Sequence, residues 1–145
     1  MLKENIPMKN EWTLFAITIL LAMMLTQTSM GRGGGSVNAG VWGGPHLRMD
    51  VTPQGASLEF DCAQGTIAEP LLLDPSGKFQ VKGTFRPQHG GPIRKDEPSN
   101  EIGMVYTGIV EGDSMQLEFT LPADAGTPEK FTLVRGQPGR VVKCG

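Results

Sequence analysis

Residues 111–121 read EGDSMQLEFTL, and from Met115 to Leu121 apolar and polar side chains alternate without a break. Successive side chains of a β-strand point to opposite faces of a sheet, so this alternation predicts a strand with one buried face and one solvated face. The first four residues of the stretch have the composition of a tight turn. Because residues 102–110 are also rich in strand formers, residues 102–121 together predict a β-hairpin.

The same period of two recurs along the chain after residue 40, and no helical period of useful length appears there. Pro followed two residues later by Gly, at 52–55 and 74–77, is typical of a turn between strands. We therefore predict an all-β fold, a small antiparallel barrel or half-barrel of seven or eight strands, with a sandwich as the alternative. The other expected strands are residues 47–51, 58–62, 67–73, 79–86 and 130–133, with Val142 and Cys144 in one phase at the C-terminus.

The N-terminal region has the pattern of an export signal. Residues 12–25 (WTLFAITILLAMML) carry no charge, Gly or Pro. This run is shorter than the roughly 20 apolar residues that cross a bilayer, and it is typical of the centre of a signal peptide. The small residues Ser29 and Gly31 predict cleavage after Gly31, and Met8 is an alternative start.

These patterns predict a signal peptide over 1–31, a flexible linker over 32–39 and a single β domain over 40–145. The protein is expected to be secreted or periplasmic, and to meet the membrane only through its signal peptide during export. An uncleaved N-terminal membrane anchor is the alternative. With 13 basic and 15 acidic residues, a net charge of −2 and no basic block, the chain is not suited to binding nucleic acid.

The two cysteines, Cys62 and Cys144, both lie in the predicted β domain. Export to an oxidising compartment favours a disulfide between them. Each cysteine falls in the apolar phase of its expected strand, so we expect both sulfurs to face the interior. Neither has a His or a cationic cluster beside it in the sequence, which argues against a reactive thiol.

The two histidines of the chain, His46 and His89, each adjoin Gly-Gly-Pro, in GGPH (43–46) and HGGP (89–92). Gly-Gly-Pro combines a permissive backbone with a rigid one, which favours loop junctions. His89 lies in a segment of Pro, Gly and charge at 86–101, and loops of this length are often binding loops. The candidate binding loop residues are His46, His89, Arg94 and Lys95.

The chain contains residues of three catalytic chemistries. A metal site would use His46 and His89, with Asp50, Asp96 or Glu97 as a third ligand, but the histidines lack a ligand spacing. A serine nucleophile at Ser114 lacks the helix that follows it in α/β-hydrolases. The acids expected on wet faces or in turns, Glu59, Asp61, Asp113 and Glu118, do not single out a catalytic pair. We therefore predict no catalytic residue, no metal and no cofactor.

Two resemblances add to this reading. The G-x-W at 40–42 and the LVRG at 133–136 resemble calycins, the lipocalin-like barrels. In that arrangement Trp42 would plug one end of the barrel and Arg135 would lie against it, both with structural roles, and Arg140 is a rival for the Arg. The set GVWGGPH, EFDCAQGTI, HGGP, YTGIVEGDSMQL and the closing LVRG…KC resembles small exported bacterial proteins of unassigned function. This second resemblance implies export and a compact β fold, and it implies no activity.

The expected function is non-enzymatic binding of a small apolar ligand at a barrel mouth, or docking of a protein partner through the long loop. A solid core of Phe and Leu side chains would leave no such pocket. Some short calycin-like proteins inhibit proteases, so a second hypothesis is an extracytoplasmic protease inhibitor that inserts its 32–39 arm. A small metal-dependent enzyme that uses His46 and His89 is the third.

Overall fold

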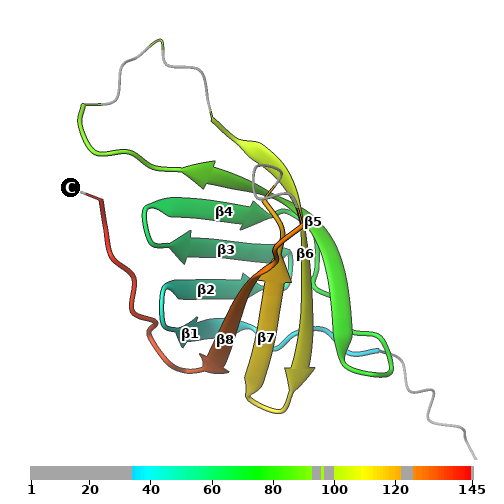
Figure 1. Cartoon of the computed structure of the whole chain (residues 1–145). Helices are drawn as coiled ribbons and strands as arrows, with labels where there is room; N and C mark the ends of the chain where they lie inside the picture. Colours follow the sequence, from blue (N-terminus) through cyan, green and yellow to red (C-terminus); the bar gives the residue numbers. More distant parts are fainter. Residues whose placement is uncertain (1–33, 93–95, 97–99, 122–125, 145) are drawn as a thin grey trace, which may run out of the picture. The chain divides into compact units, whose positions relative to one another are not determined.

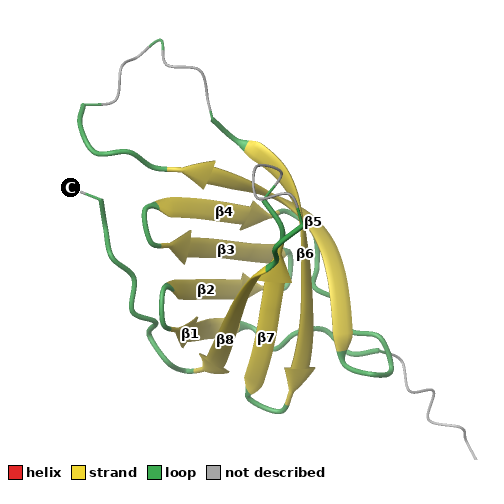
Figure 2. Cartoon of the chain, in the orientation of Figure 1, coloured by secondary structure: helices red, strands yellow, loops and turns green. Residues whose placement is uncertain are grey.

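The structure is a computed structural model that describes residues 34–92, 96, 100–121 and 126–144. The predicted signal peptide, Arg94 and Lys95 lie outside the described residues. Eight strands form one closed barrel in which every neighbour along the chain is an antiparallel neighbour in space (Figures 1 and 2). The all-β antiparallel barrel is thus confirmed. The strands are β1 (Gly40–Gly44), β2 (Leu47–Thr52), β3 (Gly55–Phe60), β4 (Ala63–Ile67), β5 (Lys78–Pro87), β6 (Ile102–Glu111), β7 (Ser114–Phe119) and β8 (Glu129–Arg135).

Figure 1 shows β1–β4 lying across β6–β8 at a steep angle, with the long β5 passing from one group to the other. The connections β1–β2, β3–β4, β5–β6 and β7–β8 all lie at one end of the barrel, because consecutive strands run in opposite directions. We call this the phenylalanine end, after Phe60, Phe85, Phe119 and Phe131, which lie in or beside the strand termini there. In the part of the chain that is described, no helix has the length and hydropathy needed to span a bilayer.

Two strands were not expected, and two expected strands are absent from the described residues. The sequence predicts the first strand at 47–51, and β1 precedes it; β1 forms by pairing with β2 from Gly40–Val51 to Gly44–Leu47. β4 follows β3 through a turn at Asp61 and Cys62. It ends at Ile67, where the expected strand at 67–73 was to begin. The C-terminal residues 136–144 pair only through an isolated bridge at Arg140.

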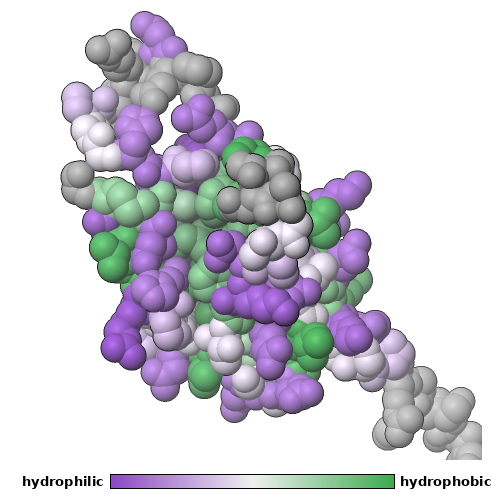
Figure 3. Space-filling model, in the orientation of Figure 1, coloured by the Kyte–Doolittle hydropathy of each residue, from purple (hydrophilic) through white to green (hydrophobic). Residues whose placement is uncertain are grey.

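The interior is packed by side chains of the inward phase of each strand, and most side chains of the opposite phase are polar, with Val105, Ile109 and Val134 as exposed exceptions. Figure 3 shows hydrophobic residues of the visible face as small separate areas among hydrophilic ones. Ten large side chains of the interior have essentially no exposed surface. They are Trp42, Leu47, Met49, Leu58, Ile67, Leu71, Tyr106, Met115, Leu117 and Leu133.

Tyr106 fills the space left by two inward-facing glycines. A Cβ at Gly65 would lie 2.6 Å from the Tyr106 hydroxyl, and a Cβ at Gly83 would lie 2.8 Å from its ring. The fully buried hydroxyl donates a hydrogen bond to the carbonyl oxygen of Thr84 at 2.8 Å. Burial also raises the pKa of Tyr106, so the hydroxyl keeps its proton as a donor.

The predicted flexible linker at 32–39 differs from the structure where it is described. Ser36 forms a β-bridge with Leu72, and the Val37 amide donates to the Leu71 carbonyl at 2.9 Å. Val37 is buried in the core. This part of the segment packs on the barrel because Val37 is apolar. The polar composition of the stretch as a whole obscured this single apolar residue.

The C-terminal segment 136–144 returns along the ends of β1–β4 (red in Figure 1). The Arg140 amide donates to Gly44 O at 3.0 Å, and the Cys62 amide donates to Val142 O at 3.2 Å. The predicted disulfide between Cys62 and Cys144 is present, with a Cα–Cα distance of 5.1 Å. The expected inward orientation of both sulfurs is wrong. Because β3 ends at Phe60, Cys62 lies in a turn with φ of 54°, and Cys144 is exposed.

Candidate functional site at the phenylalanine end of the barrel

A depression of about 540 Å³ opens at the phenylalanine end. Its floor is a cluster of aromatic rings, in which the Phe60 ring lies 5.3–5.6 Å from the rings of Phe85, Phe119 and Phe131. Such tilted and edge-to-face pairs are favourable ring geometries. Apolar clefts of this size with a few polar groups at the rim are typical small-ligand sites. The lining is Pro45, His46, Phe60, Asp61, Phe85, Phe119, Leu121, Glu129, Lys130, Phe131 and Thr132.

The depression lies where the barrel wall closes incompletely. β8 pairs with β7 from Glu129 to Val134, but it pairs with β1 only at Val134 and Arg135. The first residues of β8 therefore have a strand partner on one side alone. The β1–β2 corner at Pro45 and His46 lines the same depression, which exposes part of the aromatic cluster between this corner and β8.

His46 is held at this corner in an unusual conformation. Its φ is 66°, in the left-handed region that residues other than Gly rarely adopt. The His46 amide donates to Arg140 O at 2.7 Å, so the C-terminal segment fixes the backbone there. Non-glycine residues held in this region occur often at functional sites.

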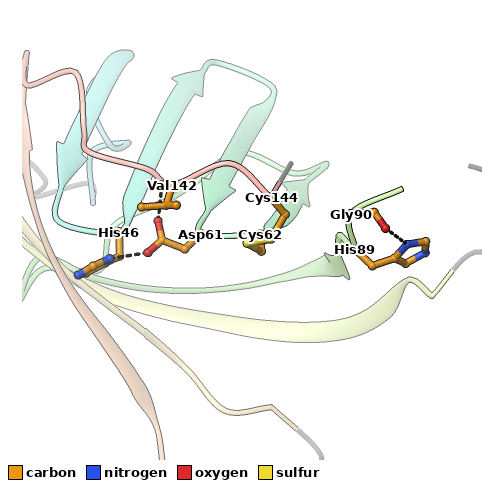
Figure 4. The surroundings of a disulfide bond; sticks show 7 residues. All are labelled: His46, Asp61, Cys62, His89, Gly90, Val142 and Cys144. Atoms are coloured by element: carbon orange, nitrogen blue, oxygen red, sulfur yellow. Dashed lines mark hydrogen bonds and ion pairs between the residues drawn. A yellow bond between two sulfur atoms is a disulfide. The ribbon is translucent and has the colours of Figure 1, made fainter. Parts of the chain in front are cut away.

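The His46 ring is fixed by Asp61 in the β3–β4 turn (Figure 4). The His46 Nδ1 lies 2.5 Å from Asp61 Oδ2, and Asp61 Oδ1 accepts a hydrogen bond from the Val142 amide at 2.7 Å. The hydrogen bond from the Val142 amide, which has the larger effect, and the one from the His46 ring hold the pKa of Asp61 below its usual range. An ionised carboxylate only accepts hydrogen bonds, so the proton is on Nδ1, and Nε2 is the ring nitrogen that remains for another partner.

The two histidines lie at the same end of the barrel but do not form one site. Figure 4 shows His46 and His89 on opposite sides of the Cys62–Cys144 disulfide. The His89 Nδ1 is 3.4 Å from the carbonyl oxygen of the adjacent Gly90. Among the described residues, no group of three His, Cys, Asp or Glu side chains could hold a metal ion. The metal hypothesis therefore has no support from the described positions of its ligands.

The residues expected to have structural roles lie away from the depression. Trp42 and Arg135 are opposite each other in the β1–β8 pairing, and Trp42 is fully buried. The Trp42 Nε1 donates to Asn38 O at 2.9 Å. The Arg135 Nε donates to Asp113 Oδ1 in the β6–β7 turn, at 2.7 Å.

Ser114 begins β7 beside the β6–β7 turn, at the end of the barrel opposite the depression. The serine-hydrolase pattern therefore places its nucleophile away from the apolar cleft. Among the described residues that line the depression, the carboxylate and ammonium side chains are those of Asp61, Glu129 and Lys130. Lys130 also forms an exposed ion pair with Glu118 at 3.5 Å, an interaction that is worth little in water.

Comparisons with known proteins do not identify the chain: no family model, no curated protein and no solved structure matches it. The resemblance to exported bacterial proteins and to calycins therefore remains a prediction. The sequence does not predict the pairing of His46 with Asp61, because its alternation places Asp61 on the outward face of a strand at 58–62. Its position between the strand residue Phe60 and Cys62 gave no separate signal of a turn.

Proposed function

We propose that this protein is an exported, non-enzymatic barrel that binds a small apolar ligand in the depression at the phenylalanine end. The supporting observation is the aromatic cluster of Phe60, Phe85, Phe119 and Phe131 beneath an opening of about 540 Å³. A ligand that covers these rings removes apolar surface from water, which is the main favourable term in such binding.

Export is supported by the apolar run at 12–25 and by the disulfide, since disulfides persist in oxidising compartments. The inhibitor hypothesis is less well supported. The arm that would enter a protease is held at Ser36 and Val37 by backbone hydrogen bonding to the segment at 71–73. Ligand binding in the depression does not require the segment at 32–39 to be free.

Binding can be tested with a fluorescent amphipathic probe, 1-anilinonaphthalene-8-sulfonate, whose aromatic rings are apolar and whose sulfonate is anionic, and with its displacement by dodecan-1-ol. Leu121 lines the depression and is half-buried, so Leu121→Asp places a charge beside the bound probe. We expect the probe to bind about tenfold more weakly to this variant, which corresponds to about 1.4 kcal/mol.

Leu72→Asp is the matched control, because Leu72 is 64% exposed and lies in the connection between β4 and β5. It makes the same chemical change away from the depression, and probe affinity should stay at the wild-type value. Equal affinities of the two variants, or no saturable binding by the wild-type protein, would refute the proposed site.

A further inference from the structure

We propose that His46 is the polar anchor of this ligand site and that it selects amphipathic molecules with a carboxyl head group. The inference rests on the proposed function and names the chemical class of its ligand. The apolar part would cover the phenylalanine cluster, and the carboxyl group would meet Nε2 of His46 at the rim. His46 and the phenylalanine cluster line the same depression.

The His46 ring is positioned by three separate parts of the chain. The β1–β2 corner supplies its left-handed backbone, the β3–β4 turn supplies Asp61, and the C-terminal segment supplies Arg140 O and the Val142 amide. The Cys62–Cys144 disulfide joins the last two parts one residue beyond Asp61. Supporting contacts of this kind hold a polar group in one orientation before a ligand arrives, which reduces the ordering cost of binding.

The chemistry of the free nitrogen favours a carboxyl group. With Nδ1 donating to Asp61, a neutral ring leaves Nε2 as an acceptor, and a protonated ring makes it a donor. A carboxylic acid meets either state, because its O–H can donate to the bare nitrogen and its carboxylate can accept from N–H. In both cases a single proton lies in the hydrogen bond between Nε2 of His46 and the carboxyl group of the ligand. An alcohol can also hydrogen-bond to Nε2, but it carries no charge and cannot form an ion pair with a protonated ring, and a quaternary ammonium has no proton to donate.

The charges around the ring determine whether an anionic head is tolerated. Both oxygens of Asp61 already accept hydrogen bonds, one from His46 and one from the Val142 amide. Glu129 and Lys130 from β8 also line the depression, and their charges oppose each other. Glu129 works against an anionic ligand. Glu129→Gln should therefore tighten carboxylate binding a few-fold if the head group lies at this rim.

The test compares three probes with one alkyl chain: dodecanoic acid, dodecan-1-ol and dodecyltrimethylammonium, each titrated calorimetrically into the oxidised protein below its aggregation concentration. We expect the wild-type protein to bind dodecanoic acid at least about tenfold more tightly than the alcohol, as expected for a charge-assisted hydrogen bond. His46→Asn should bind acid and alcohol with equal affinity. Asn tolerates the left-handed backbone at this position.

His89→Asn is the matched control, since it is the same change beside the other Gly-Gly-Pro, and it should keep the preference for the acid. Nitrogen-15 NMR of the wild-type protein gives a second measurement that requires no variant. Dodecanoic acid should shift the Nε2 resonance of His46 and leave that of His89 in place.

The failures of the two proposals are distinguishable. If the alcohol and the acid bind the wild-type protein equally, or if His46→Asn keeps the preference, the anchor is refuted and the apolar site stands. Tighter binding of the ammonium probe would also refute the carboxyl anchor, and it would assign the rim to Glu129. If none of the three probes binds, the ligand-binding function fails and the anchor fails with it.

Discussion

Replacing both Cys62 and Cys144 by Ser should cost this barrel a large part of its stability. The disulfide joins residues separated by 82 positions. In the chain-entropy model, a closed loop of this length removes about 15 cal/mol/K from the unfolded chain, or about 4.5 kcal/mol at 25 °C. Domains of this size are stable by about 5–15 kcal/mol, so the loss is a major fraction.

The assay is equilibrium unfolding in urea, followed by circular dichroism and by the fluorescence of Trp42. The free energy of unfolding of the double Ser variant should fall by about 4 kcal/mol. The denaturant slope should rise, because the uncrosslinked chain exposes more surface when it unfolds. Wild-type protein treated with a phosphine reductant should behave like the variant.

A loss below about 1 kcal/mol would refute this reasoning. It would mean that the unfolded chain stays compact without the crosslink, or that the backbone hydrogen bonds of the C-terminal segment contribute little to folding. If the unfolded chain stays compact, the denaturant slope of the variant equals that of the wild-type protein. If the hydrogen bonds contribute little, the slope of the variant is higher.

Three further predictions follow from the same structure. Asp61 and Asp74 have pKa values lowered in the folded protein, Asp61 mainly by the Val142 amide and Asp74 mainly by the Ser76 side chain. Their contribution to stability is therefore present above the ordinary carboxyl pKa and lost as the pH falls through the lowered values; urea unfolding between pH 6 and pH 2 should show a flatter dependence for Asp61→Asn/Asp74→Asn, and identical curves would contradict the prediction. Gly65→Ala should destabilise the barrel by about 1–3 kcal/mol because its Cβ would meet the Tyr106 hydroxyl, whereas Gly103→Ala, where nothing lies within 4 Å, should change stability by less than about 0.5 kcal/mol in thermal melts. The intact mass of the exported protein should match a chain that begins at Arg32 and lacks two hydrogens; a mass that retains residues 12–25 would favour the membrane anchor instead.

The alternation of side chains predicted most of the barrel wall, since it reports directly which face of a strand is buried. It located β2, β5, β6 and β7, and the turn between β6 and β7, to within a few residues. It did not predict β1, whose glycines carry no pattern, or the end of β3 at Phe60. In the sequence the apolar phase continues through Cys62, yet the backbone reverses at Asp61 and Cys62.

The site was less predictable, because it depends on contacts between turns that are distant in the sequence. The pairing of Cys62 with Cys144 followed from counting cysteines. The His46–Asp61 contact joins residues 15 positions apart, and it exists only because the β1–β2 and β3–β4 connections lie at the same end of the barrel. The sequence placed His46 and His89 in similar loops, but the orientation of each ring is set by neighbours that no local pattern identifies.

The short pairing between β1 and β8 has a consequence for how the chain reaches this structure. Seven of the eight strand pairings join neighbours in the sequence, whereas Trp42 and Arg135 are about 90 residues apart. Local pairings form quickly, and a contact across most of the chain carries a large loop-closure cost that is offset by only two residue pairs. The meander from β2 to β7 should therefore assemble early and the ring should close late, so the edges of β1 and β8 would be the last backbone exposed to other chains during folding. The aromatic cluster beside that seam would be covered in the same final step.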